Sequence, residues 1–235
     1  MFDHQKVTLA ELPRTELLAR LRAQVAVKEA RIRQAPYPVH PVLAALLPDG
    51  GLKPGAAYSL TGAGALLLAL LAEPSREGHW CGVVGMRDFG AEAAALAGVE
   101  LDRLALIPDP AEQWLAIAAA LVEAVPIVAV RPVGRVSEGD AAKLMSRLRD
   151  REAVLLVDGP WPRAEAQLSV SELRWSGVGA GYGYLASREV TVTVNSRRNP
   201  LSRSVRLVLP TAEGRMSAAA VAVAAEQLTG LRAVG

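Results

Sequence analysis

The stretch "YSLTGAGALLLALL", residues 58–71, predicts a short apolar strand, a tight turn containing Gly62 and Gly64, and an apolar helix. Glycines in such a turn let backbone N–H groups point outward, as they do where many α/β proteins hold phosphate. A phosphate-binding loop also needs a lysine for the phosphate charge and a Ser or Thr for magnesium. Ala65 and Leu66 stand where those residues belong, so the stretch predicts the fold without nucleotide chemistry and leaves at most weak affinity for anions.

The composition is that of a globular protein with a sizeable core, since 51% of the 235 residues are hydrophobic and 21% are charged. Cys81 is the single cysteine, which excludes an internal disulfide, and its apolar surroundings favour inert burial over reactivity. The three histidines lie far apart without zinc spacing, so we expect no metal site and no cofactor. A net charge of +2 does not by itself indicate a nucleic-acid partner.

The chain begins without a basic leader followed by an apolar stretch. Its longest apolar run, residues 65–72, is too short to cross a bilayer. We therefore expect a cytoplasmic protein with no membrane contact.

Short apolar segments alternate with segments rich in alanine and leucine between residues 57 and 158. The predicted strands are residues 57–61, 80–85, 104–107, 126–131 and 153–158. The predicted helices are residues 64–72, 89–97, 111–124 and 138–150. Strands that are apolar on both faces and alternate with helices predict an α/β fold with a mainly parallel sheet flanked by helices.

The pattern changes after Asp158. Residues 159–167 contain three prolines or glycines and predict neither a central strand nor a regular helix, and residues 176–184 are flexible by composition. Alternating Val and Leu residues on either side of "SRRNPLSR" predict a C-terminal antiparallel hairpin over residues 189–210. Residues 218–228 are expected to form a small closing helix.

The N-terminal part predicts an amphipathic helix over residues 14–34, with an apolar stripe formed by Leu18, Leu21, Val25 and Ile32. Three prolines in residues 35–41 then favour an extended connector. We therefore divide the chain into an arm and linker, residues 1–41, and a core, residues 42–235. The stripe can pack on the core or on a partner protein, and the connector favours a partner.

The carboxyl ends of two predicted strands carry Met86 and Arg131. Chemistry in parallel sheets gathers at these ends, where an ATPase has carboxylates that orient water and hold magnesium. Methionine can neither orient water nor bind magnesium, and the positive charge of arginine repels a metal ion. Arg131 can instead pair with an acidic neighbour such as Asp158 or contact a phosphate.

The segments "PDGGLKPGAAYSLTG", "CGVVGMRDFGAEAAALAGVELDRLALIPD" and "AEQWLAIAAALVEAVPIVAVRP" follow one another in an order that resembles RecA-type recombinases over residues 42–158. The resemblance is carried most clearly by Gly98-Val99-x-x-Asp102-x-Leu104, then Pro108-Asp109 and Glu112-Gln113. It implies a RecA-like core. It also implies that the nucleotide lysine, the magnesium hydroxyl, the catalytic glutamate and the second-strand aspartate are replaced by Ala65, Leu66, Met86 and Arg131.

A RecA-like core without ATPase residues, preceded by a helical arm, resembles the ImuA family, especially the ImuA-prime form of actinobacteria. This resemblance implies a non-enzymatic adaptor in DNA damage tolerance and SOS mutagenesis. Its expected partners are a polymerase-like ImuB-type protein, an error-prone replicative-type polymerase in translesion synthesis, and RecA. Two alternatives stay open: an ATP-binding recombinase relative with a rearranged site, and a DNA-binding repair module.

Two further groups of residues are candidates for contacts. The hairpin arginines are predicted either to bind DNA phosphates weakly or to keep an edge hairpin soluble; they are Arg197, Arg198, Arg203 and Arg206. Trp161 lies between two prolines and is expected to be exposed, either as a partner contact or as a structural anchor. Tyr182 and Tyr184 suit base stacking, but residues 177–185 carry no cation to hold DNA.

Overall fold

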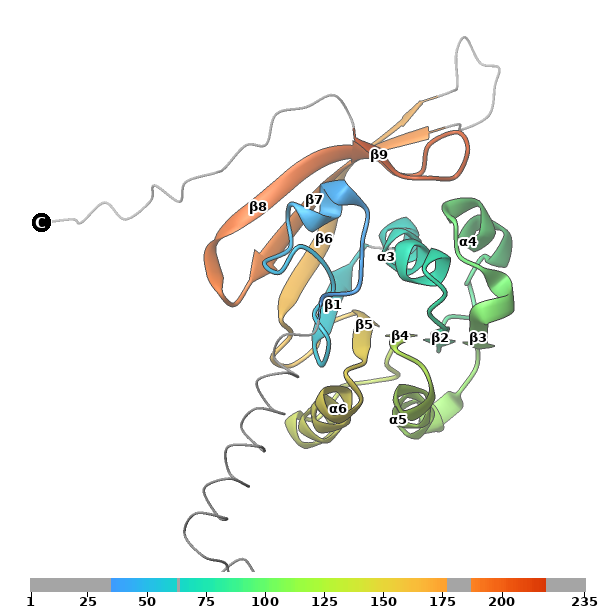
Figure 1. Ribbon diagram of the computed structural model, residues 1–235, viewed down its shortest axis with the longest axis vertical. Helices are drawn as coiled ribbons and strands as arrows, with labels where there is room; N and C mark the ends of the chain where they lie inside the picture. The colour runs from blue at the N-terminus through green and yellow to red at the C-terminus, as the bar shows by residue number, and fades with distance from the viewer. Residues whose placement is uncertain (1–34, 63, 177–186, 219–235) are drawn as a thin grey trace, which may run out of the picture. The chain divides into compact units, whose positions relative to one another are not determined.

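The computed structural model describes residues 35–62, 64–176 and 187–218. Within these residues, nine strands form one sheet in the order β3-β2-β4-β5-β1-β6-β7-β8-β9 (Figure 1). The described residues from Pro36 onward belong to one compact unit. The sheet joins a parallel part, which the central stretch of sequence predicts, to an antiparallel part at the C-terminal end.

The parallel part contains the five predicted strands, each within one residue of its predicted ends. They are β1 (Ala57–Thr61), β2 (Cys81–Val84), β3 (Leu104–Ile107), β4 (Ile127–Val130) and β5 (Val154–Asp158). Neighbouring strands pair in parallel, and β2 and β4 are buried along their whole length because helices cover both faces. The predicted RecA-like parallel sheet is confirmed.

Four longer helices flank this sheet. They are α3 (Gly64–Arg76), α4 (Ala91–Ala97), α5 (Trp114–Ala124) and α6 (Glu138–Arg151). In Figure 1, α3 and α4 lie on one face of the sheet, and α5 and α6 lie on the other. The helix α3 passes its predicted end at Ala72, because Pro74 removes a single N–H in the last turn and does not end the helix. Two short 3₁₀ helices, η2 (Leu101–Arg103) and η3 (Ala111–Gln113), lie in the connections.

The predicted hairpin is present as β7 (Ser187–Ser196) and β8 (Asn199–Val208), with β9 (Ser217–Ala218) beside β8. The sequence did not predict β6 (Ala166–Ser176), which pairs with β1 in parallel and with β7 in antiparallel orientation. Polar residues on its outward side hide the apolar alternation, and a bulge between Ser171 and Arg174 interrupts the period. The predicted closing helix lies outside the described residues except for Ala218, which is in β9.

The proline-rich stretch before residue 42 packs on the core. Tyr37 and Leu52 exchange two backbone hydrogen bonds, and the Tyr37 hydroxyl donates to the Glu152 carbonyl at 3.1 Å. Val39 is buried, and the short helix α2 (Pro41–Ala44) begins at His40, whose Nδ1 accepts from the Val42 N–H. The extended conformation follows from the prolines, but the compact unit starts at Pro36 and not at Val42.

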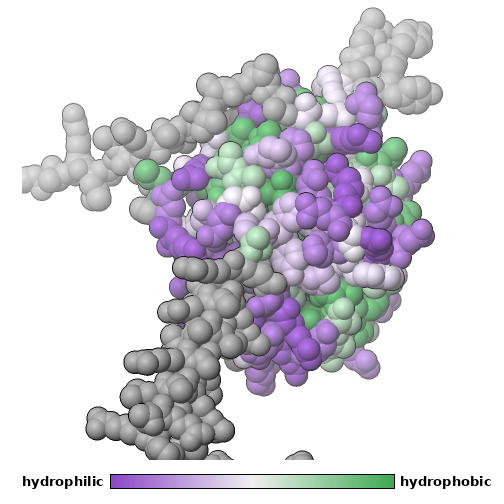
Figure 2. Space-filling view, in the orientation of Figure 1, coloured by the Kyte–Doolittle hydropathy of each residue, from purple (hydrophilic) through white to green (hydrophobic). Residues whose placement is uncertain are grey.

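Two hydrophobic clusters occupy the two faces of the sheet. One lies among α2, α3, α4 and the inner sides of β7 and β8, and the other lies under α5 and α6. Hydrophilic residues cover most of the surface that Figure 2 shows, with hydrophobic residues in smaller separate areas. None of the helices in the described part of the chain combines the length and apolar character that a bilayer crossing requires.

Candidate functional site

The carboxyl edge of the parallel sheet brings together the ends of β1, β2, β4 and β5. After β1 the chain turns at Gly62, which has a φ of +67°, and enters α3 at Gly64. A side chain at Gly62 would lie 3.3 Å from the Val170 carbonyl oxygen on β6, whereas Gly64 has open space. The turn therefore joins β1 to α3, as the opening stretch of sequence predicts, and it also lies against β6, which the sequence did not predict.

The side chains at the remaining predicted nucleotide positions belong to the core. Leu66 is fully buried and Met86 is 2% exposed, and both lie in the cluster on the α3 side of the sheet. Ala65 is partly buried against the same cluster. Apolar packing thus occupies the positions where a nucleotide site would need a hydroxyl and a carboxylate.

Arg131 lies between two carboxylates at this edge. Its Nε donates to the Oδ2 of Asp158 at 2.7 Å, and its Nη1 donates to the Oδ1 of Asp88 at 2.5 Å. The predicted pairing with Asp158 at the end of β5 is confirmed. The structure adds Asp88, which follows β2, so one guanidinium joins the ends of three strands.

The electrostatics of this group follow from the ion pairs. The hydrogen bond from Arg131 holds the pKa of the Asp88 carboxyl below its ordinary value. The bonds to Asp88 and Asp158 raise the pKa of the Arg131 guanidinium, against the opposing effect of its partial burial. Arg131 keeps 40% of its side chain exposed, so solvent screens the attraction and the pairs fix geometry more than they add stability.

The backbone at the end of β2 depends on glycine. Gly85 has a φ of +77°, and a Cβ there would lie 2.6 Å from the Arg131 carbonyl oxygen. The Gly85 N–H donates to the Ile107 carbonyl, and the Arg131 N–H donates to the Val84 carbonyl. Only a residue without a side chain lets β2 and β4 approach this closely at the edge.

A second ion pair lies at the ends of β2 and β3. The Arg87 Nη2 donates to the Asp109 Oδ2 at 2.6 Å, and both side chains are largely exposed. Among the described residues, no group of three or more His, Cys, Asp or Glu side chains is placed to hold a metal ion. The carboxylates of this edge, Asp88, Asp109 and Asp158, are each engaged by an arginine.

Trp161 requires a correction. It is 6% exposed and packs in the cluster under α5 and α6, so the expectation of an exposed ring between two prolines is wrong. The prolines only exclude regular structure, and they leave the side chain free to turn inward. Its indole N–H has no hydrogen-bond partner among the described residues.

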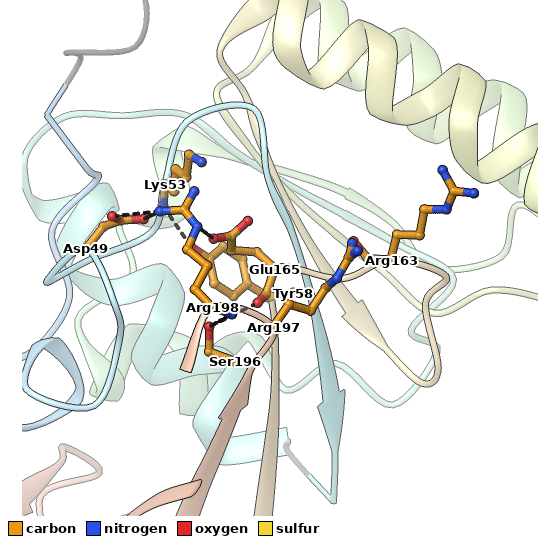
Figure 3. Close-up of polar contacts among 8 residues, drawn as sticks. All are labelled: Asp49, Lys53, Tyr58, Arg163, Glu165, Ser196, Arg197 and Arg198. Atoms are coloured by element: carbon orange, nitrogen blue, oxygen red, sulfur yellow. Dashed lines mark hydrogen bonds and ion pairs between the residues drawn. The ribbon is translucent and has the colours of Figure 1, made fainter. Parts of the chain in front are cut away.

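The hairpin arginines do not act as one group. Arg198 pairs with Asp49 at 3.3 Å and with Glu165 at 2.8 Å, and Figure 3 shows its guanidinium between the two carboxylates. The Arg203 Nη1 donates to the Ala45 carbonyl, and the Arg197 Nη1 donates to the Arg163 carbonyl. Arg206 is exposed on β8. Arg198 therefore anchors the β7–β8 turn to the core, which is neither of the two roles predicted for it.

The helical stripe predicted to bind a partner, Leu18, Leu21, Val25 and Ile32, lies outside the described residues. The same is true of Tyr182 and Tyr184.

Sequence reasoning missed the acidic partners Asp88, Asp49 and Glu165. Asp88 comes a few residues after a predicted strand end. Because the carboxyl ends of parallel strands lie at one edge of the sheet, its position in the sequence could have indicated that it lies near Arg131. Asp49 and Glu165 carried no such signal, because each meets Arg198 only through contacts distant in sequence.

Known proteins support the fold. The crystal structure of the flagellar accessory protein FlaH from Methanocaldococcus jannaschii matches with a TM-score of 0.53 and 12% identity, covering 80% of this chain and 99% of that one. The similarity at this level of identity concerns the fold alone.

Sequence comparison shows a closer relationship. The uncharacterized protein Rv3395c of Mycobacterium tuberculosis (strain ATCC 25618 / H37Rv) is 34% identical over 162 residues, which are 66% of this chain and 76% of that protein. The model of the MT3502 N-terminal domain matches residues 45–163, the segment that contains the carboxyl edge from β1 to Trp161. The chain therefore belongs to the MT3502 N-terminal domain family.

Proposed function

We propose that this protein is a non-catalytic, RecA-like adaptor of the ImuA-prime type, which supports translesion synthesis in DNA damage tolerance. The observation that carries the proposal is the position of Arg131 between Asp88 and Asp158. A magnesium nucleotide needs free carboxylates at this edge, and here both carboxylates are hydrogen-bonded to one guanidinium. In this proposal, partner proteins bind the fold instead of a nucleotide.

The buried residues at the edge support the same proposal. Leu66 and Met86 contribute to the core, so introducing a hydroxyl or a carboxylate there would disturb packing. Arg131 joins the ends of β2, β4 and β5 through its bonds to Asp88 and Asp158. The core then acts as a rigid platform, and the predicted N-terminal helix with its stripe contacts an ImuB-type protein.

Two binding measurements with the full chain test the proposal. Isothermal titration calorimetry with ATP and magnesium is expected to give no low-micromolar affinity, and such affinity would instead indicate an ATP-binding recombinase relative. Titration with a purified ImuB-type protein is expected to give specific binding. Titrations with RecA and with an error-prone polymerase test whether either is a further partner.

A matched pair of variants tests the helical stripe. Leu21→Glu places a charge in the apolar stripe, and Ala23→Glu places the same charge about half a helical turn away from it. We expect Leu21→Glu to weaken binding of the ImuB-type protein at least tenfold and Ala23→Glu to leave it nearly unchanged. Equal binding by the two variants would show that the stripe does not contact this partner.

A further inference from the structure

Strands β6, β7 and β8 have one face in the core and an opposite face, the outer face, that is partly or fully exposed. Val190, Val192 and Leu207 are buried on the inner side, and the residues that alternate with them point outward. Among the described residues, no member of β6, β7 or β8 belongs to the cluster under α5 and α6. The pairing register places these side chains on the outer face: Gln167, Ser169, Ser171, Arg174, Glu189, Thr191, Thr193, Asn195, Ser202, Ser204, Arg206 and Val208.

The polar side chains of the outer face form regular rows across the three strands. Ser169, Thr193 and Ser204 lie opposite one another in one row. The next row contains Ser171, Thr191 and Arg206. Successive rows are about 6.8 Å apart and the three strands span about 10 Å, from ordinary strand geometry. An extended single strand of nucleic acid repeats its phosphates at a similar interval.

Several hydroxyls in these rows are not engaged by the described residues. Within the part of the chain that the structure describes, the side chains of Ser169, Ser171, Thr193 and Ser204 make no hydrogen bond. Each is only partly buried or exposed, so each hydroxyl is available to donate to an oxygen of a ligand. Hydroxyl and amide side chains are common donors to phosphate and sugar in nucleic-acid complexes.

Arginines lie at both ends of the outer face, measured along the strands. Arg174 is exposed at one end of this face, where Glu189 is its acidic neighbour in the ladder, and Arg206 is exposed in the row of Ser171 and Thr191. Arg163 and Arg197 lie at the other end, next to each other and away from Asp49 (Figure 3). Glu138 approaches Arg163 at 3.9 Å, and both side chains are more than three-quarters exposed. Around this face, Arg163, Arg174 and Arg197 outnumber the acidic side chains that lie near them among the described residues, Glu138 and Glu189.

We propose that the outer face binds the sugar-phosphate backbone of single-stranded nucleic acid without sequence preference. Val208 is the one apolar side chain of the twelve, whereas protein interfaces centre on buried aromatic or aliphatic anchors. The width of three strands fits one chain, and the arginines at the ends match its charge. This activity goes beyond the adaptor function and uses other residues than those of the carboxyl edge and of the predicted N-terminal helix.

Fluorescence anisotropy of a labelled oligo(dT) strand with the full chain tests the proposal. We expect binding that weakens steeply with salt. Thr193→Glu, in the row with Ser169 and Ser204, should weaken it at least tenfold, while the matched control Ser146→Glu on the exposed side of α6 should not. Arg174→Ala should lower the slope of log Kd against log salt by about 0.7, and Arg147→Ala on α6 should leave it unchanged.

The Arg174 and Arg147 pair keeps the test valid if Thr193→Glu fails to fold, which circular dichroism detects. Oligo(U) is expected to bind about as well as oligo(dT), because the face contacts only the backbone. Absence of salt-dependent binding, or equal losses in the outer-face and α6 variants, would overturn the proposal. Binding of the ImuB-type protein by Arg174→Ala is expected to be unchanged, so the two proposals fail independently.

Discussion

The Nε of Arg131 donates to the Oδ2 of Asp158 at 2.7 Å and thereby joins the ends of β4 and β5. The same guanidinium reaches Asp88 beyond β2, so two carboxylates and one arginine meet at the carboxyl edge of the sheet. The relationship has consequences for titration and for stability.

Replacing Arg131 by alanine should lower the free energy of unfolding by about 1 kcal/mol, since the pairs are screened by solvent at a side chain that is 40% exposed. Urea denaturation measures this change. Arg87→Ala, which breaks the more exposed pair with Asp109, serves as the control and should have no measurable effect.

The same substitution should change the titration of Asp88. Arg131 lowers the pKa of Asp88, so the pair stabilises the folded state above the ordinary value of 3.8 and this contribution is lost as the pH falls through the lower folded value. Carboxyl NMR should show the Asp88 pKa rising toward its ordinary value in Arg131→Ala. An unchanged titration would mean that the ion pair does not form in solution.

Gly85→Ala should destabilise the protein by at least about 2 kcal/mol, because the new Cβ meets the Arg131 carbonyl oxygen and the positive φ is strained. Gly50→Ala separates the two effects, since Gly50 has a φ of +71° with nothing within 4 Å of a Cβ. This control should cost only about 1 kcal/mol in thermal or urea unfolding. Equal costs would exclude the close approach at Gly85.

Leu66→Thr restores a hydroxyl at the position of the magnesium ligand in recombinases, but it should not restore nucleotide binding. Leu66 is fully buried, so the change should cost about 2–4 kcal/mol in unfolding free energy. The same change at Leu96, which is 53% exposed on α4, should cost less than about 1 kcal/mol. ATP binding by Leu66→Thr would contradict the assignment of this position to the core.

Cys81 should make the protein less stable at alkaline pH. Burial raises the pKa of its thiol from 9.0 to about 12 in the folded state. Between these values the unfolded chain loses the proton first, so stability falls as the pH rises, by about 1.4 kcal/mol per unit. The difference in unfolding free energy between wild type and Cys81→Ala should therefore shrink from pH 9 to 11. Because both proteins contain the buried Tyr58, this difference reports the titration of the thiol and not that of the tyrosine.

Glu165→Gln should loosen the turn between β7 and β8, because Arg198 then keeps only its pair with Asp49. Limited trypsin digestion followed by mass spectrometry should show faster cleavage after Arg197 and Arg198. Glu138→Gln, whose carboxylate lies 3.9 Å from Arg163 at exposed positions, is the control and should leave the rate unchanged.

The sequence predicted the parallel strands well because each is a short apolar run between turn residues, a pattern set by neighbours in the chain. It missed β6 because that strand is polar on the side facing away from the core and is interrupted by a bulge. At the carboxyl edge it predicted the pair of Arg131 with Asp158, but it placed Trp161 on the surface, since flanking prolines define the backbone and not the direction of a side chain.

The sequence by itself therefore determined the alternation of strands and helices and the residue types that stand at the carboxyl edge, Ala65, Leu66, Met86 and Arg131. The tertiary structure alone decided which charges meet, because Asp49, Glu165 and Arg198 come together from segments up to 149 residues apart. It also decided which face each polar residue of β6 to β8 occupies. That placement depends on strand register, which is fixed by packing between distant segments and cannot be obtained from local composition.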